Sequence, residues 1–177
     1  MLVLAGSPLT AVSQTSQPPK GGSAQIMSEL RLKILTTKAS EMQIGPTAEF
    51  PRVYAILMDW PLGTNVITLF SSCLGDASIY STSTFGIIGG IGHERVRMAA
   101  KDFVKIGEAH FQDSVATKEF PLPKPGKVYF YLVCFDGVRG IESDEESLKS
   151  RKDKFLDLYG QGQRVITELR TVSELKK

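Results

Sequence analysis

The order of apolar and polar positions predicts an antiparallel meander in the first half of the chain. Residues 53–58 form an uninterrupted apolar run, which predicts a strand covered on both faces. Residues 66–73 and 77–85 are rich in strand-forming side chains, and the Leu-Gly-Asp sequence at 74–76 between them suits a short hairpin loop. Three consecutive antiparallel strands are therefore expected.

The second half predicts a helix, a hairpin and a closing helix. Between residues 94 and 111 the apolar positions recur every three or four residues, as on one helical face. Residues 128–135 give the strongest strand pattern, and an Asp-Gly turn leads into a short returning strand at 138–142 and a polar loop. Apolar positions between 156 and 169 indicate a second helix, with the Gly-Gln-Gly sequence at 160–162 as a candidate break. The fold class is then α+β: a mostly antiparallel sheet of about five strands with two main helices packed on it.

The N-terminal part of the chain gives weaker signals. Residues 29–44 fit a strand or a helix, and we favour the helix because Met27, Leu30 and Ile34 share a helical face. Residues 1–26 are rich in Ser, Pro and Gly, which predicts a disordered extension. Because the sequence from Met27 reads like a translation start, a mis-assigned start is the alternative. The single folded domain is expected to cover residues 27–177.

Composition narrows the class of protein. A chain of 177 residues with 42% hydrophobic and 23% charged residues is typical of one globular domain. The net charge of +2 gives no global field that would attract nucleic acid or an anionic membrane. No basic residue precedes Lys20, so a signal peptide is not expected and the prediction is a cytoplasmic protein. Cys73 and Cys134 are isolated within apolar runs, which is typical of reduced core cysteines.

A glycine-rich segment runs from a predicted strand directly into the helix expected at residue 94. The ligand-binding candidates within it are Gly86, Gly89, Gly90, Gly92 and His93. Backbone N–H groups at such a junction can bind an anion, and His93 and Glu94 would then be the catalytic candidates. The spacing matches neither the dinucleotide-binding nor the P-loop motif. The alternative is a tight strand-to-helix turn that places Ile87, Ile88 and Ile91 in the core.

Other catalytic signatures are weak. His93-Glu94 begins like the zinc-protease motif, but Arg97 stands where the second histidine is required, and His110 lies at the far end of the predicted helix. No metal site and no cofactor are therefore expected. No nucleophile-elbow motif occurs in the sequence. Trp60, at a strand end beside a proline, is either an anchor for a partner or a cap on the core.

Several segments resemble known small bacterial single-domain proteins with no assigned activity. The resemblance covers roughly residues 50–172 and is carried by Leu-Gly-Asp-Ala-Ser-Ile-Tyr-Ser from 74, Gly-Ile-Ile-Gly-Gly from 86, His-Glu-Arg-Val-Arg from 93 and Phe-Tyr-Leu-Val-Cys-Phe-Asp-Gly-Val-Arg from 130. It implies a bacterial protein and transfers no catalytic residue. The order of elements is also similar to profilin-like and roadblock-type modules, which are scaffolds and regulators. That likeness is architectural, and fold does not imply function.

These observations favour a non-enzymatic binding or regulatory module that contacts another protein or a second copy of itself through a sheet edge or a helix face. The alternative is a protein or enzyme that binds a small anionic or phosphate-bearing ligand at residues 86–94. Nucleic acid and membrane are not expected as partners.

Overall fold

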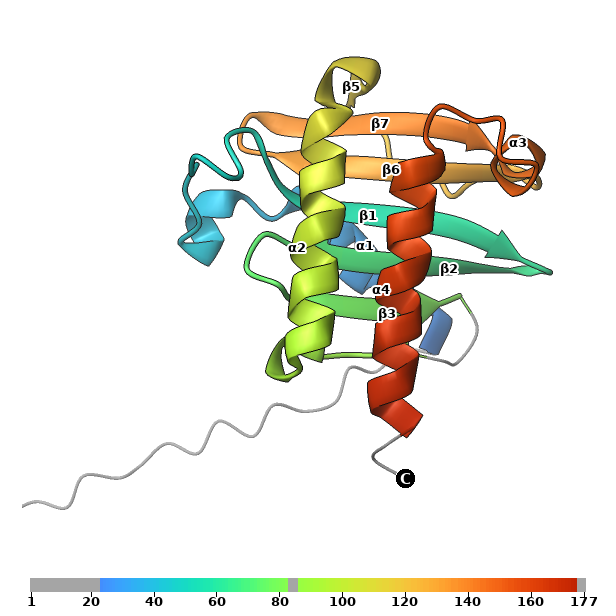
Figure 1. Cartoon of the computed structure of the whole chain (residues 1–177), viewed down its shortest axis with the longest axis horizontal. Coiled ribbons are helices and arrows are strands. Elements are labelled where there is room, and N and C mark those ends of the chain that lie inside the picture. The colour runs from blue at the N-terminus through green and yellow to red at the C-terminus, as the bar shows by residue number, and fades with distance from the viewer. Residues whose placement is uncertain (1–22, 83–85, 175–177) are drawn as a thin grey trace, which may run out of the picture.

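The computed structural model describes residues 23–82 and 86–174, which form one open antiparallel sheet with helices on both faces (Figure 1). Its strands are β1 Val53–Leu62, β2 Asn65–Ser72, β3 Ala77–Ser81, β4 Gly86–Ile87, β5 Val115–Thr117, β6 Lys127–Cys134 and β7 Gly137–Asp144. Its α-helices are α1 Ser23–Thr36, α2 Glu94–Ala109, α3 Glu145–Lys149 and α4 Leu156–Glu174. Three short 3-10 helices are η1 Ala39–Met42, η2 Gly90–Gly92 and η3 Phe111–Asp113. The strand order is β4-β3-β2-β1-β6-β7-β5.

The predicted α+β class is confirmed, and the predicted meander and hairpin are both present. Among the described residues the sheet has seven strands rather than about five, because β4 and β5 are too short to give a sequence pattern. Four α-helices lie in the part of the chain that the structure describes, and α2 and α4 are the two main helices predicted. The favoured helix at 29–44 is present as α1 up to Thr36, and α3 lies in the predicted polar loop. The helix α4 continues through Gly160 and Gly162 without a break.

The first described helix contains Met27, the residue at which the domain was expected to begin. Helix α1 begins at Ser23, four residues before the expected domain start, and residues 1–22 lie outside the described part of the chain. The expected strand at 77–85 ends at Ser81, and its last three positions are likewise outside the description.

Helices α2 and α4 lie side by side across one face of the sheet (Figure 1). Close contact is possible because glycines face the strands. A Cβ on Gly107 would lie 3.1 Å from Ile56 and from Leu132, and one on Gly162 would lie 2.8 Å from the sulfur of Met58. The strand side chains at this interface are almost completely buried. This face is therefore a closely packed core.

Helix α1 lies on the opposite face, behind the sheet in Figure 1. It is held there by a buried ion pair in which Arg31 donates to Asp59 Oδ2 from Nη2 at 2.6 Å and from Nε at 2.9 Å. Thr68 donates to the other oxygen of the same carboxylate at 2.5 Å. Arg31 also donates to the carbonyl of Phe120 at 2.8 Å, so one side chain ties the helix to the sheet and to the loop before β6.

Candidate functional site

The glycine-rich segment forms a compact turn between β4 and α2. Gly89 has a left-handed φ of 84°, which favours glycine, and the 3-10 turn η2 follows it. The N–H of His93 donates to the carbonyl of Gly90 at 3.1 Å, and the N–H of Arg97 donates to the carbonyl of His93 at 2.9 Å. The first of these bonds pairs the N–H of the residue before α2, and the second is the first intrahelical bond of α2.

Gly90 has a packing role in this turn. It is buried, and a Cβ built on it would lie 2.5 Å from Val96 Cγ1 and 2.8 Å from Leu169 Cδ2. The turn thus passes directly against the α2 and α4 side chains. Ile88 and Ile91 are 67% and 47% exposed, so the prediction that they fill the core is wrong. Only Ile87 packs against the core, because the short β4 strand turns one isoleucine inward.

His93 and Glu94 are not brought together with other chemically active groups. His93 is half-buried and its side chain makes no cap hydrogen bond, whereas exposed Glu94 pairs with Arg97 one turn along α2. Neither residue lines the hollow beside β5 or the hollow beneath α1. The geometry of Gly86–Glu94 thus fits a strand-to-helix turn better than an anion site.

Trp60 caps the core at the end of β1. Its indole N–H donates to Glu145 Oε1 at 3.2 Å, and its ring packs edge-on against Tyr159 of α4 with centroids 6.4 Å apart. The side chain is half-buried and contacts the main hydrophobic cluster. These contacts explain the tryptophan without a partner.

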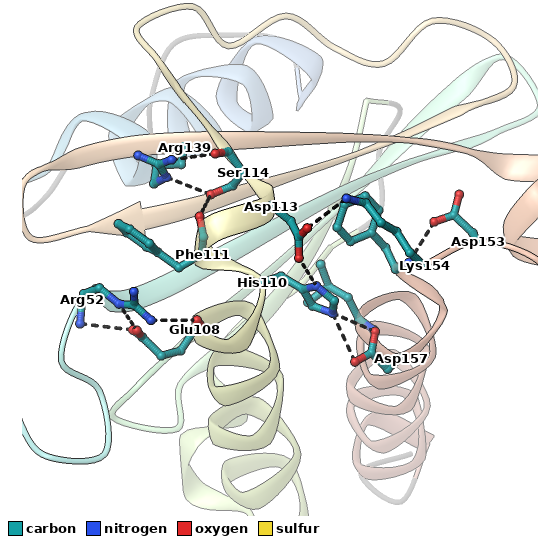
Figure 2. Close-up of polar contacts among 12 residues, drawn as sticks. Arg52, Glu108, His110, Phe111, Asp113, Ser114, Arg139, Asp153, Lys154 and Asp157 are labelled. Carbon is teal, nitrogen blue, oxygen red and sulfur yellow. Dashed lines mark hydrogen bonds and ion pairs between the residues drawn. The ribbon is translucent and has the colours of Figure 1, made fainter.

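A polar cluster joins the C-terminal end of α2 to the start of α4 (Figure 2). His110 Nδ1 lies 3.2 Å from Asp113, and its Nε2 lies 2.9 Å from Asp157. Lys154 donates to the other oxygen of Asp113 at 2.9 Å, and these contacts hold the pKa of Asp113 below its usual value. The His110 ring also packs edge-on against Phe155. Every polar atom of the imidazole is thus occupied by a structural contact, as expected for a semi-buried helix-end histidine.

Beside the His110 cluster, a second set of contacts joins the end of α2 to the start of β1. Glu108 accepts hydrogen bonds from the backbone N–H groups of Arg52 and Val53 at 3.1 and 2.7 Å, and also pairs with the Arg52 side chain. Phe111 lies between two guanidinium groups, with the Cζ atoms of Arg52 and Arg139 4.2 and 4.5 Å from its ring centre (Figure 2). These side chains have protein partners and act as a clamp between α2 and the sheet.

The cysteines give no nucleophile. Cys73 and Cys134 are free and buried, as predicted. Burial raises the pKa of the Cys134 thiol to about 12 and also raises that of Cys73, so both thiols stay protonated at neutral pH. Within residues 23–82 and 86–174, no group of three or more His, Cys, Asp and Glu side chains is placed to hold a metal ion.

A groove that the sequence did not reveal lies over the β5-β7-β6 side of the sheet. This β5 groove, of about 390 Å³, is lined by Thr117, Glu119, Tyr129, Tyr131, Gly140 and Glu142, with Pro121 beside them. Tyr131 donates to the carbonyl of Pro121 at 2.7 Å, which fixes the ring, and Tyr129 packs edge-on against it. A Cβ on Gly140 would meet Thr117 at 3.6 Å and Tyr131 at 4.0 Å, so the missing side chain leaves the floor open.

The edge of this groove is an exposed strand. β5 pairs with β7 on one side and is the last strand of the sheet as described for this chain. Val115 is 72% exposed, and Ala116 is exposed as well. The sequence feature that could have indicated this groove is the spacing of Tyr129 and Tyr131, which places both rings on one face of a strand. The strand β5 has only three residues and gives no recognisable pattern.

Comparisons with known proteins give no relatives for this fold and these sites. No protein-family model matches the chain, and neither a curated protein nor a solved structure matches it significantly. Among the described residues, no helix has the length and apolar character that crossing a bilayer requires.

Proposed function

We propose that this protein is a non-enzymatic binding module that docks an extended segment of a partner protein in the β5 groove. The observation that carries the proposal is an aromatic groove directly beside an exposed edge strand. Edge strands bind extended peptides through main-chain hydrogen bonds, and adjacent hollows accept alternate side chains. Tyrosines supply contact area at a low cost in conformational entropy.

The rim of the groove indicates the chemistry of the peptide. Glu119 and Glu142 are both exposed and line the hollow, while its walls are the rings of Tyr129 and Tyr131. Glu142 lies 3.4 Å from Lys127, which is outside the groove lining and neutralises only part of this acidic rim. A segment with an apolar residue next to Lys or Arg would therefore match both the aromatic walls and the acidic rim.

The positions of the polar side chains favour binding over catalysis. His110, Glu108 and Asp113 have protein partners, and His93 and Glu94 do not line the β5 groove. Recognition of a partner surface is the function that these side chains still allow. It requires a matching shape and charge, whereas catalysis requires an acid, a base and a nucleophile held close together.

The test is selection of peptides from a displayed random library against the folded protein, followed by titration of synthetic peptides. The selected sequences are expected to combine an apolar residue with Lys or Arg. Their binding is expected to perturb the backbone amide signals of residues 115–117 and 139–142. Glu119→Gln should weaken binding several-fold, because it removes one of the two rim charges.

Gly140→Val provides the decisive variant. Valine suits a strand and fills the groove floor, so the fold should be retained while peptide binding falls at least about tenfold. Gly160→Ala is the matched control, because this exposed glycine of α4 has no atom within 4 Å of a built Cβ. Selected peptides that bind folded Gly140→Val as tightly as the original protein would contradict the proposal, as would a failure to select any peptide.

A further inference from the structure

A second hollow lies beneath helix α1, on the β3 side of the same sheet face. This α1 pocket measures about 350 Å³ and is lined by Leu30, Ile34, Phe70, Asp76, Ser78 and Tyr80 among others. The size falls within the range of about 300–1,000 Å³ that small-molecule sites occupy. Most of its wall is aliphatic or aromatic. Its polar side chains come from β3 and the turn before it (Asp76, Ser78 and Tyr80), from α1 and the residue after it (Lys33 and Thr37) and from β1 (Tyr54).

The polar groups of the pocket include an unpaired acceptor. Asp76 Oδ1 is buried and has no hydrogen-bond partner. The backbone of Asp76 is held in place by its N–H, which donates to Ser72 Oγ at 3.2 Å. Burial raises the pKa of Asp76 and also that of Tyr80, whose side chain is hydrogen-bonded to Ser78. A buried carboxylate oxygen without a donor is costly, so a donor that reaches this carboxyl group stabilises the folded protein.

The helix over the pocket is held from elsewhere. Arg31, one residue from Leu30, forms the ion pair with Asp59 and the bond to the Phe120 carbonyl. This anchor lies on the β1-β2 side of the helix. It keeps α1 on the sheet without needing the space above β3 to be filled, so a hollow can persist there.

We propose that the α1 pocket binds a small apolar molecule that carries one positively charged amino group. The ammonium donates to the Asp76 carboxylate, and the apolar body lies between Leu30 and Ile34 of the helix and Phe70 of the sheet. A carboxylate selects a cation over a neutral alcohol of the same shape, since a hydrogen bond between two charged groups is stronger than one from a neutral donor. Lys33 also lines the pocket, and its side chain is exposed. It disfavours a ligand whose ammonium group lies next to Lys33 rather than next to Asp76.

The experiment titrates the protein with three molecules of matched shape: phenethylamine, 2-phenylethanol and 3-phenylpropanoate. Backbone amide shifts of Ile34, Asp76 and Ser78 report occupancy of the pocket. Phenethylamine is expected to bind saturably and at least about tenfold more tightly than the alcohol, with the carboxylate weakest. The peptide site is tested separately, because Gly140→Val should leave phenethylamine binding unchanged.

Two variants separate the role of the carboxylate from that of the cavity. Asp76→Asn should weaken phenethylamine binding at least about tenfold and leave 2-phenylethanol binding nearly unchanged, whereas Asp136→Asn, an exposed acid outside this pocket, should change neither. Ile34→Phe should weaken both by filling the space. The proposal is overturned if phenethylamine gives no saturable shifts, or if folded Asp76→Asn binds it as well as the original chain.

Discussion

The two faces of the sheet are packed in different ways, although the same strands form both. Under α2 and α4, glycines bring helix backbone against strand side chains, and residues such as Phe103, Leu132 and Leu169 are fully buried. Under α1, the principal contact is a buried ion pair between Arg31 and Asp59, and hollows of about 350 and 390 Å³ lie over the two halves of that face.

We infer from this difference that the α2/α4 face mainly stabilises the fold and that the α1 face binds partners. Where helix backbone lies this close to the strands there is no room for a ligand, because each displaced methyl group must be accommodated by neighbours at crystal-like density. A hollow on this face, of about 620 Å³, lies farther along, between the C-terminal half of α4 and the strand residues Trp60 and Ile79. The α1 face has the opposite properties: free volume, fixed tyrosines and an unpaired carboxylate oxygen. We therefore expect substitutions at the glycine contacts of the α2/α4 face to affect the free energy of unfolding alone. On the α1 face they should affect binding as well, apart from those at the ion pair that holds the helix.

The largest effect is expected at that ion pair. Arg31→Met should lower the free energy of unfolding by about 3–5 kcal/mol, because it leaves the fully buried Asp59 carboxylate without its cation. Burial already raises the pKa of Asp59 against the opposing effect of Arg31, and removing the arginine raises that pKa further. The variant should therefore lose less stability at acidic pH than at neutral pH. Urea denaturation at two pH values measures both results.

The double variant Arg31→Met with Asp59→Asn is the control for this prediction. It removes the stranded charge, so much of the stability lost in Arg31→Met should return at neutral pH. An Arg31→Met protein as stable as the original at neutral pH would show that the ion pair does not hold α1 in place.

The next largest effect belongs to the closely packed face. Gly90→Ala should lower the free energy of unfolding by about 1–3 kcal/mol, since its methyl group would lie 2.5 Å from Val96 and 2.8 Å from Leu169. Gly92→Ala, in the same 3-10 turn, is the matched control, because no atom lies within 4 Å of its built Cβ. Equal thermal denaturation curves for the two variants would contradict the packing role assigned to Gly90.

The sequence predicted the closely packed face better than the open one. The 3.6-residue periodicity of residues 94–111 and the apolar runs at 53–58 and 128–135 determine which side chains are buried, and the structure has α2, β1 and β6 there. Such signals are local and strong. The strands β4 and β5 have two and three residues, too few for a periodic pattern, and α1 was ambiguous because exposed Leu32 imitates strand alternation.

The hollows could not be predicted because they depend on register and tertiary placement. Tyr131 lies opposite Gly140 only through the β6-β7 pairing, and Thr117 joins them only through the pairing of β5 with β7. Asp76 was read as a turn residue, which it is, but its unpaired oxygen becomes significant only where α1 covers it. Sequence reasoning instead singled out the glycines at 86–92, for which it offered both a ligand-binding and a packing interpretation; Gly90 in the structure has a packing role.

A smaller effect is expected at Asp76. Burial raises the folded-state pKa of Asp76 above its ordinary value of 3.8, so the protonated carboxyl favours folding below pH 3.8 and this contribution is lost as the pH rises through the folded-state pKa. Asp76→Asn should therefore gain stability relative to the original chain as the pH rises from about 4 to 7. Melting temperatures across this range measure the trend. A difference that stays constant with pH would show that burial does not perturb this carboxyl.

The smallest effects are expected at the helix start that the sequence singled out. His93→Ala and Glu94→Gln should each change the free energy of unfolding by less than about 0.5 kcal/mol, because neither side chain is buried and the Glu94–Arg97 pair is exposed. Both variants should bind the selected peptides and phenethylamine like the original chain, as measured by the same titrations. A loss of either binding in a folded His93→Ala protein would move the functional site from the α1 face to the α2 N-terminus. The closely packed and open faces would then no longer divide stability from recognition.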